Sequence, residues 1–448
     1  MTKRNVLSIA GSDPSGGAGI QADMKSFSKM GVHGLTVITC ITSQNTKNVQ
    51  NIYPLPTQVI ESQLDVLCED FRIDGIKTGM LYDDEIIKIV SKKMKEYKLC
   101  PVVDPVMVAT SGDSLSVDSY IHTLKTYLLP LTYFLTANIS EATSLSDISI
   151  TTIDDVKKSA KKLYELGPKN ILIKGGHLQT KQSVDVFYDG NMFYELSLPR
   201  IMGKKAHGSG CSLSAVIASL LASGESPLAS VNKAKHIIWS MIYKGYTPGK
   251  GSDVLHHLCP HILPFSLSEE KISVWVQLDK EIENLLSHLP IFLIPEVGMN
   301  FAYACDKAKI SDDICAIDGR IVKTKNKPMC LGELNFGVSQ HVSSIILTAM
   351  SFDKNIRSAL NIKYSEDNLK RCNNAKLRIG YFERKNEPKF TKSTMEWGTK
   401  NTIENLGFVP DIIYDLGGVG KEPMIRILGK NPRDVLKKLK KIIQTDIR

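Results

Sequence analysis

Short apolar runs alternate with helical patterns through the first half of the chain. Candidate strands lie at residues 6–10, 35–39, 75–78, 102–106, 133–136 and 171–174. Helical spacing of apolar positions recurs between them, at residues 22–29, 84–97 and 154–166. This alternation is typical of βαβ units around a parallel sheet. We therefore predict a doubly wound, mostly parallel α/β domain with helices on both faces, which binds ligands beyond the carboxyl ends of its strands.

An aperiodic segment separates the two halves of the chain. Residues 259–268 carry two prolines and show no regular spacing of apolar positions. We therefore predict a first domain at 1–262, a linker at 263–271 and a second α/β domain at 272–448.

The second domain opens with a helical pattern. Apolar positions at residues 270–288 have the spacing of an amphipathic helix, and a short strand is expected at 291–294. Further on, a helix is expected at 342–350 and a strand at 411–414.

The composition is that of a globular protein, with 42% hydrophobic and 23% charged residues. The net charge of +9 is spread thinly. Its densest lysine runs have helical spacing without interleaved aromatics, so solvated helix faces explain them and no nucleic-acid partner is expected. Nine cysteines without C-x-x-C spacing indicate reduced thiols in the cytoplasm. Neither a signal peptide nor a membrane span is apparent.

Two glycine clusters are candidates for binding loops. The first, at residues 11–19, includes Gly17-Ala-Gly-Ile-Gln-Ala22, which matches the dinucleotide fingerprint G-x-G-x-x-A. That fingerprint also requires an acidic residue after the next strand, where this chain has Thr39-Cys-Ile-Thr-Ser-Gln44. A nicotinamide-dependent dehydrogenase is therefore disfavoured. The chain also contains no Walker A motif.

The second cluster, Gly208-Ser-Gly-Cys211, leads directly into a helical pattern. Free backbone N–H groups at a helix start bind anions, and a helix start packed on the sheet is the alternative. The helix dipole at this position favours a thiolate, so Cys211 is a candidate base, or otherwise an inert buried thiol. Lys174 after a strand can hold a phosphate, and Asn138 and Glu141 offer oxygen ligands suited to Mg²⁺-bound phosphates.

A histidine-rich segment, His256-His-Leu-Cys-Pro-His261, contains residue types that suit zinc. It has no second pair at a structural-site spacing. A segment that closes the domain is therefore the preferred interpretation.

Seven segments taken in order resemble the hydroxymethylpyrimidine phosphate kinases of the ribokinase-like superfamily, over nearly all of residues 4–258. They are Gly11-Ser-Asp-Pro-Ser-Gly-Gly-Ala-Gly-Ile-Gln-Ala-Asp23, Ile41-Thr-Ser-Gln-Asn45, Ile76-Lys-Thr-Gly-Met80, Val103-Asp-Pro-Val-Met107, Asn138-Ile-Ser-Glu141, Lys174-Gly-Gly-His177 and His207-Gly-Ser-Gly-Cys211. Two departures are visible: Ser209 stands where Thr is common, and Ala137 where Pro is frequent.

The resemblance implies a role for each matched residue. The residues implied in the pyrimidine pocket are Gly11, Asp23, Gln44 and Met80, with Val106 or Met107 nearby. Those implied around ATP are Gly208, Ser209 and Gly210 as the anion hole, and Lys174 and Asn138 at the phosphates. Cys211 would replace the aspartate base of most of the superfamily, and Glu141 with Asp104 would organise Mg²⁺ through water. The nearest alternative activity is that of a pyridoxal kinase, and a non-catalytic nucleotide-binding module is a further one.

The second domain offers weaker signals from its residues alone. Arg320 follows Asp318-Gly319, which reads as a turn, and His341 precedes the expected helix at 342–350. A glycine loop at 415–421 suits a phosphate or a plain turn.

Residues 272–445 resemble the thiamine phosphate synthase domain that is fused to this kinase mainly in archaea. The implied reaction joins hydroxymethylpyrimidine diphosphate to thiazole phosphate, giving thiamine phosphate and diphosphate, with Arg320 and His341 as catalytic candidates. A domain that senses thiamine phosphates without catalysis is the alternative. The expected partners are these small molecules, and we expect a homo-oligomer.

Overall fold

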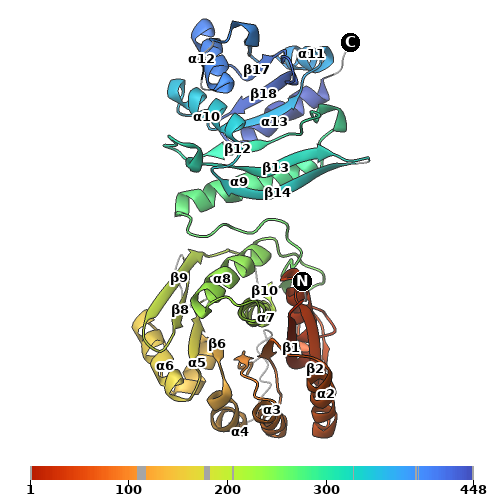
Figure 1. The fold of residues 1–448 in the computed structure, drawn as a ribbon, viewed down its shortest axis with the longest axis vertical. Helices are drawn as coiled ribbons and strands as arrows, with labels where there is room; N and C mark the ends of the chain where they lie inside the picture. The colour runs from red at the N-terminus through yellow and green to blue at the C-terminus, as the bar shows by residue number, and fades with distance from the viewer. Residues whose placement is uncertain are drawn as a thin grey trace. The chain divides into compact units, whose positions relative to one another are not determined.

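The computed structural model divides the chain into two compact units, Met1–Cys259 and Pro260–Arg448, which are described separately (Figure 1). The structure describes residues 3–107, 118–175, 182–203, 206–325, 327–388, 391 and 393–445.

The first unit is built on a nine-stranded sheet in the order β3-β2-β1-β4-β5-β6-β7-β8-β9. The strands are β1 Asn5–Ser12, β2 His33–Gln44, β3 Val49–Pro54, β4 Gly75–Thr78, β5 Val102–Val103, β6 Phe134–Asn138, β7 Asn170–Lys174, β8 Gln182–Tyr188 and β9 Phe193–Pro199. The strands β2, β1, β4, β5, β6 and β7 pair in parallel in that order, and β3, β8 and β9 add antiparallel edges. A short parallel pair, β10 Ala206–His207 and β11 Asp253–Val254, lies apart from this sheet.

Helices connect the parallel strands. They are α1 Gly19–Lys29, α2 Thr57–Asp70, α3 Asp84–Glu96, α4 Asp118–Thr123, α5 Ile139–Ser146, α6 Ile153–Glu165, α7 Ser209–Ala222 and α8 Pro227–Tyr243, with a π turn at Leu124–Leu128 and a 3₁₀ turn at Leu129–Leu131. Helix α7 packs against α1 and α8 and against β4. Its residues from Ser212 to Leu220 are all buried, which explains why they are small or apolar.

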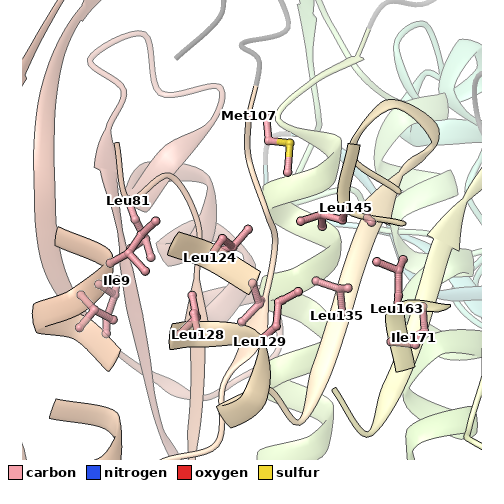
Figure 2. Close-up of a cluster of buried hydrophobic side chains, with 14 of the residues drawn as sticks. Ile9, Leu81, Met107, Leu124, Leu128, Leu129, Leu135, Leu145, Leu163 and Ile171 are labelled. Atoms are coloured by element: carbon pink, nitrogen blue, oxygen red, sulfur yellow. The ribbon is translucent and has the colours of Figure 1, made fainter. Parts of the chain in front are cut away.

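The main hydrophobic core of this unit lies between the central strands and α3, α5 and α6 (Figure 2). Leu135 of β6 and Ile171 of β7 are direct neighbours across the sheet, and neither has any exposed surface. Each such side chain contributes about 1.5–3 kcal/mol by leaving water. This core fixes the strand ends that carry the candidate site.

All six strands and all helices predicted for the first half are present, which confirms the doubly wound interpretation. Two details differ. Strand β5 ends at Val103, so residues 104–107 already belong to the loop that follows the carboxyl end of this strand. The antiparallel edge strands β3, β8 and β9 were not predicted.

The second unit contains a seven-stranded sheet in the order β14-β13-β12-β15-β18-β17-β16. Its strands are β12 Phe301–Ala304, β13 Ile314–Lys323, β14 Pro328–Phe336, β15 Ser358–Lys363, β16 Ile379–Tyr381, β17 Ile412–Asp415 and β18 Met424–Gly429. All pairs are antiparallel except β16 with β17. Its helices are α9 Glu269–Leu286, α10 Gln340–Phe352, α11 Glu366–Asn374, α12 Thr394–Leu406 and α13 Pro432–Gln444.

Successive side chains of each strand point to opposite faces of this sheet, and helices cover both faces. Ala302 and Ala304 of β12 join a buried cluster with α10 and α12. Helices α9 and α13 pack against one another and against strands of the same sheet. The predicted helices and the strand at the start of the glycine loop are therefore present.

Two local predictions for the second half are wrong. Residues Ile291–Leu293 form a 3₁₀ turn after Pro290, closed by a hydrogen bond from the Leu293 N–H to the Pro290 carbonyl, and not a strand. Residues 318–320 lie inside β13, and not in a turn. Gly319 there has a φ of +142° and faces Gly332 with a φ of +107°. A Cβ at Gly319 would lie 2.0 Å from the Leu331 carbonyl oxygen, so the two glycines serve this close strand pairing.

None of the described helices combines the length and the apolar character that crossing a membrane requires.

Candidate active site

The glycine loop after β1 packs directly on the start of α7. Gly208, the residue before α7, has a φ of +81°, and a Cβ there would lie 1.8 Å from the Gly17 carbonyl oxygen. Gly19 has a φ of +57°, and its Cβ would lie 2.4 Å from the Gly11 carbonyl oxygen. Only glycine permits both the positive φ and this separation. The two clusters singled out in the sequence therefore form one structure.

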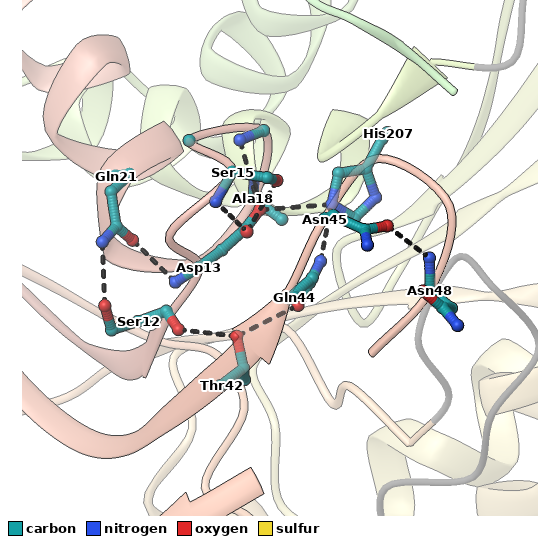
Figure 3. Close-up of polar contacts among 12 residues, drawn as sticks. Ser12, Asp13, Ser15, Ala18, Gln21, Thr42, Gln44, Asn45, Asn48 and His207 are labelled. Carbon is teal, nitrogen blue, oxygen red and sulfur yellow. Dashed lines mark hydrogen bonds and ion pairs between the residues drawn. The ribbon is translucent and has the colours of Figure 1, made fainter. Parts of the chain in front are cut away.

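Asp13 organises the loop (Figure 3). Its carboxylate accepts hydrogen bonds from the backbone N–H groups of Ser15, at 2.9 Å, and Ala18, at 2.7 Å. Burial alone would raise the pKa of Asp13, but its hydrogen bonds with His207, Ser15 and Ala18 hold that pKa below the usual value. The loop is thus built around a buried carboxylate.

His207 connects this loop to Gln44, a predicted pyrimidine ligand. Its Nε2 atom lies 3.3 Å from Asp13 Oδ2 and 3.0 Å from Gln44 Nε2 (Figure 3). A single ring nitrogen either donates to the carboxylate or accepts from the amide. The position of the Gln44 amide is therefore tied to the tautomer of His207. Asp13 and His207 both lie in the motifs that resemble the kinase family, but the sequence indicated no role for either.

Asp23 is completely buried, and its place in the pyrimidine pocket stays a prediction. It forms an ion pair with Lys77, 2.8 Å between Nζ and Oδ2, and both side chains have no exposed surface. Ser8 Oγ also donates to Asp23, at 2.5 Å. Burial raises the pKa of Asp23 although Lys77 lowers it. Lys77 lies in the motif Ile76-Lys-Thr-Gly-Met80, but nothing in the sequence indicated its ion pair with Asp23.

Cys211 lies in the first turn of α7, close enough to Lys77 for their charges to interact. Burial raises the pKa of its thiol to about 11, even though Lys77 and the Gly19 N–H lower it. Burial therefore opposes the preference for thiolate that the helix start predicts. The desolvation of the thiolate outweighs the helix dipole.

The predicted phosphate-binding residues come together beside α7. Lys174 Nζ lies 3.0 Å from Asp104 Oδ1 and 3.9 Å from Glu141 Oε2. Gly210 faces the same pair, since a Cβ there would lie 3.3 Å from Lys174 Nζ. Burial raises the pKa of Glu141 to about 7, the Asp104 charge adds to this effect and Lys174 opposes it.

Asn138 and Glu141 also form a capping box at the start of α5. The Asn138 side chain accepts from the Glu141 N–H at 2.9 Å, and Glu141 Oε2 accepts from the Asn138 N–H at 2.7 Å. This structural role fixes both side chains at the carboxyl end of β6. It leaves Glu141 facing Lys174.

The acidic residues fit a magnesium ion only in part. The described residues contain no group of three metal-binding side chains. Asp104 and Glu141 nevertheless place two carboxylates around one ammonium group. Mg²⁺ is commonly held by one or two carboxylates together with substrate phosphates and water, so the donor set suits an ion that arrives with a nucleotide.

The remaining predicted pocket residues are packed to different degrees. A Cβ at Gly11 would lie 2.6 Å from Met80 Cε, so these two residues are in contact. Met107 is 5% exposed and belongs to the hydrophobic core, whereas Val106 is half-buried (Figure 2). Val106 therefore keeps exposed surface that Met107 lacks, and their place in the pyrimidine pocket stays a prediction. Ser209 is half-buried in α7, and His177 lies outside the described residues.

In the second unit, the structure brings Arg320 and His341 into one electrostatic environment. Arg320 is exposed on β13, and His341 lies in the first turn of α10. Burial lowers the pKa of His341, and so do the charges of Arg426, Arg384 and Arg320. Sequence reasoning missed Arg384 and Arg426, since neither lies in a recognisable motif.

The first unit thus has the fold and site of a small-molecule phosphotransferase: a doubly wound sheet, a helix start with free N–H groups, and a lysine with two carboxylates beside it. The family model for phosphomethylpyrimidine kinase matches residues 13–256, and the chain belongs to that family. The model for thiamine-phosphate synthase ThiN matches residues 277–441.

Two curated relatives show how far each match extends. The bifunctional thiamine biosynthesis protein ThiDN of Methanocaldococcus jannaschii is 33% identical over 447 residues, which is 98% of both chains. The thiamine biosynthesis bifunctional protein ThiED of Geobacter sulfurreducens is 40% identical over 255 residues, and the chain spans about half of its length (52%). These matches confirm the predicted family, a bifunctional enzyme with kinase and thiamine-phosphate synthase domains.

Solved structures support the kinase fold. Pyridoxal kinase from Staphylococcus aureus in complex with AMP-PCP and pyridoxal is 34% identical, with a TM-score of 0.54 over 58% of this chain and 95% of that one. This likeness confirms the ribokinase-like fold and an ATP-using class of enzyme.

The buried pair of Asp23 and Lys77 yields a stability prediction. Asp23→Asn leaves the Lys77 ammonium group buried without a counter-charge, which should cost about 3–5 kcal/mol of unfolding free energy. The paired replacement Asp23→Leu with Lys77→Met should cost clearly less. Urea unfolding of the full chain measures both. The control Lys88→Gln, which breaks an exposed ion pair with Glu85, should leave stability unchanged. Wild-type stability of Asp23→Asn would contradict the pairing.

Proposed function

We propose that the first domain transfers the γ-phosphoryl group of ATP to the hydroxymethyl oxygen of 4-amino-5-hydroxymethyl-2-methylpyrimidine, and then a second phosphoryl group to the resulting phosphate. The convergence of Lys174, Gly210 and Asp104 beside Cys211 carries this proposal. Gln44, Gly11, Met80 and Val106 are proposed around the pyrimidine.

The chemistry follows from the charges around α7. The substrate oxygen forms a bond to the γ-phosphorus while the bond to ADP breaks, and negative charge spreads over the transferred group. The N–H groups of Gly208, Ser209 and Gly210 donate to that charge, and Lys174 with Asn138 holds the nucleotide phosphates. In the first transfer, Cys211 acts in its thiolate form and accepts the proton of the substrate hydroxyl. Because such transition states are loose, this proton transfer contributes less than positioning does.

A bound Mg²⁺ would neutralise charge on the phosphates. Asp104 and Glu141 are the residues we propose to hold it, through water. Their carboxylates also keep Lys174 protonated, because these charges raise the pKa of Lys174 more than burial lowers it.

Pyridoxal phosphorylation is the second candidate for this domain. The pyridoxal kinase structures that resemble the domain favour it, and both substrates carry a hydroxymethyl group on a six-membered aromatic ring. The family match with phosphomethylpyrimidine kinase favours the pyrimidine. Competition between the two substrates in one ATP-dependent assay decides between them.

The second domain is proposed to join the pyrimidine diphosphate to thiazole phosphate. Arg320 would stabilise charge on the departing diphosphate, and His341, whose lowered pKa keeps it neutral at neutral pH, would donate or accept a hydrogen bond there. A domain that only senses thiamine phosphate is the alternative. The fusion to a kinase that makes the diphosphate favours the synthase.

The cytoplasmic location and the homo-oligomeric state of the protein stay predictions. Free thiols such as Cys40, Cys211 and Cys372 support a reducing, cytoplasmic compartment. The expected homo-oligomer can be tested by analytical ultracentrifugation.

Replacing Cys211 tests the base. Cys211→Ala should lower kcat by about 10²–10⁴ with little change in KM for ATP. In the wild type, the thiolate fraction grows as the pH rises toward the thiol pKa of about 11, so kcat/KM should rise on the alkaline side of neutrality. Cys211→Asp should retain activity and shift that rise to lower pH. Cys68→Ala on α2 is the control. A fully active Cys211→Ala enzyme would rule out Cys211 as the base.

Replacing Glu141 tests the metal assignment. Glu141→Gln preserves the capping box, since glutamine can accept the same N–H, but removes the negative charge. The Mg²⁺ concentration for half-maximal kinase activity should rise roughly tenfold or more, as for other outer ligands. Titration of Mg²⁺ at saturating ATP gives this value, with Glu165→Gln on α6 as the control. An unchanged Mg²⁺ requirement would remove Glu141 from the site.

Replacing Arg320 or His341 tests the synthase. Arg320→Ala should lower thiamine phosphate formation by roughly 10²–10³. His341→Ala should also lower it. In both variants the pyrimidine diphosphate should accumulate, because the kinase domain is intact. Chromatography of the products measures both compounds, and His288→Ala at the end of α9 is the control. Normal thiamine phosphate yield from both variants would refute this assignment.

A further inference from the structure

The second unit contains more positive charge than Arg320 and His341 supply. Arg384 begins the 3₁₀ turn Arg384–Asn386, Lys421 follows the glycine loop after β17, and Arg426 lies in β18. Arg384 is half-buried, Arg426 is 5% exposed, and Lys421 is exposed. Buried arginines are rare unless a specific partner holds them.

One carboxylate is shared by the two arginines. Arg384 Nε lies 2.6 Å from Asp415 Oδ1 and its Nη2 lies 3.3 Å from Oδ2, while Arg426 Nη1 lies 2.7 Å from Oδ2. Asp415 is fully buried and also accepts from the Gly417 N–H at 2.8 Å. A single carboxylate balances only one of the two guanidinium charges. The group therefore keeps a fixed positive charge with little freedom to move.

The glycine loop extends this charge toward Lys421. Arg384 Cδ lies 3.8 Å from the Cβ position of Gly418, so the arginine stem rests on the loop. Gly418 and Lys421 close the loop with reciprocal backbone hydrogen bonds of 3.0 and 2.9 Å. Lys421 is thereby held on the same loop that Arg384 contacts.

The loop is also connected to Arg320. The Glu422 carboxylate accepts from the N–H groups of Glu296 and Val297, both at 3.0 Å. Gly298, in the same turn, lies against Arg320, with a Cβ position 2.8 Å from Arg320 Cβ. The loop that Arg384 contacts is therefore hydrogen-bonded to the turn that packs beside Arg320.

His341 faces the same charges from α10. After burial, the causes that lower its pKa are Arg426, Arg384, Arg320 and Lys421 in that order, all of them cations. The first turn of α10 carries no acidic residue, and Ser339 makes no side-chain capping bond there. The charges of cations from β13, β18, the 3₁₀ turn and the loop thus act on one histidine.

We propose that Arg384 and Lys421 join Arg320 and His341 in binding the diphosphate group of the pyrimidine substrate, and that Asp415 positions Arg384. The inference rests on the proposed synthase function. In that reaction the thiazole nitrogen bonds to the methylene carbon, the carbon–oxygen bond to diphosphate breaks, and diphosphate leaves with the bonding electrons. A diphosphate carries more charge than the thiazole monophosphate, which suits the larger number of cations.

The test measures inorganic diphosphate binding to the full chain by calorimetry and its inhibition of the synthase reaction. Arg384→Gln and Lys421→Gln should each weaken diphosphate binding roughly ten- to a hundredfold, the usual loss for a charge-assisted hydrogen bond. Both should raise the KM for the pyrimidine diphosphate by a similar factor and leave the KM for thiazole phosphate nearly unchanged. Kinase activity of the same chains should stay at the wild-type level.

Lys385→Gln is the matched control, since Lys385 is adjacent to Arg384 and is exposed, with Glu383 as its partner. Lys421 is exposed on a loop, so its variant keeps the test valid if Arg384→Gln does not fold. Wild-type diphosphate affinity in both variants would overturn the proposal, as would equal losses for thiazole phosphate. If the wild type forms no thiamine phosphate but binds diphosphate through Arg384, the anion site stands and the synthase proposal fails.

Discussion

The close approach of two backbone segments, the loop at residues 11–19 and the start of α7, is the constraint on which the kinase site depends. Gly17 and Gly208 nearly touch, and no side chain can be inserted between them. This contact places the free N–H groups of α7 opposite the loop that Asp13 and His207 organise. The anion site and the proposed pyrimidine site are therefore built by the same contact. Movement of either segment would disturb both.

The two units differ in how far carboxylates balance the positive charges at their proposed sites. In the kinase unit, cations are buried with carboxylates: Lys77 with Asp23, and Lys174 with Asp104 and Glu141. A site balanced in this way can accept a nucleotide that arrives with its own metal ion. In the second unit, Asp415 is shared between two arginines, and the excess positive charge suits an anion that arrives with little compensation. Each arrangement matches the charge of the substrate proposed for it.

The sequence predicted most of the first unit because its motifs follow strands whose carboxyl ends must meet in a parallel sheet. Lys174, Asp104 and Gly210 were placed together correctly for that reason. The burial of Asp23, the core position of Met107 and the raised pKa of the Cys211 thiol depend on burial by distant segments, which no local pattern encodes. In the second unit, the parallel pairing of β16 with β17 and the antiparallel pairing of β17 with β18 bring Arg384, Asp415 and Arg426 together from separate segments. Only Arg320, His341 and the glycine loop were visible in the sequence, and Asp318-Gly-Arg320, which lies inside β13, was mistaken for a turn.

The central claim is that one chain performs two consecutive steps at two separate sites. The most direct measurement mixes the variants Cys211→Ala and Arg320→Ala, and supplies hydroxymethylpyrimidine, ATP, Mg²⁺ and thiazole phosphate. Each variant alone should form little thiamine phosphate, while the mixture should recover it, because each chain supplies the site that the other lacks. Thiamine phosphate formed at the wild-type rate by either variant alone would contradict the account.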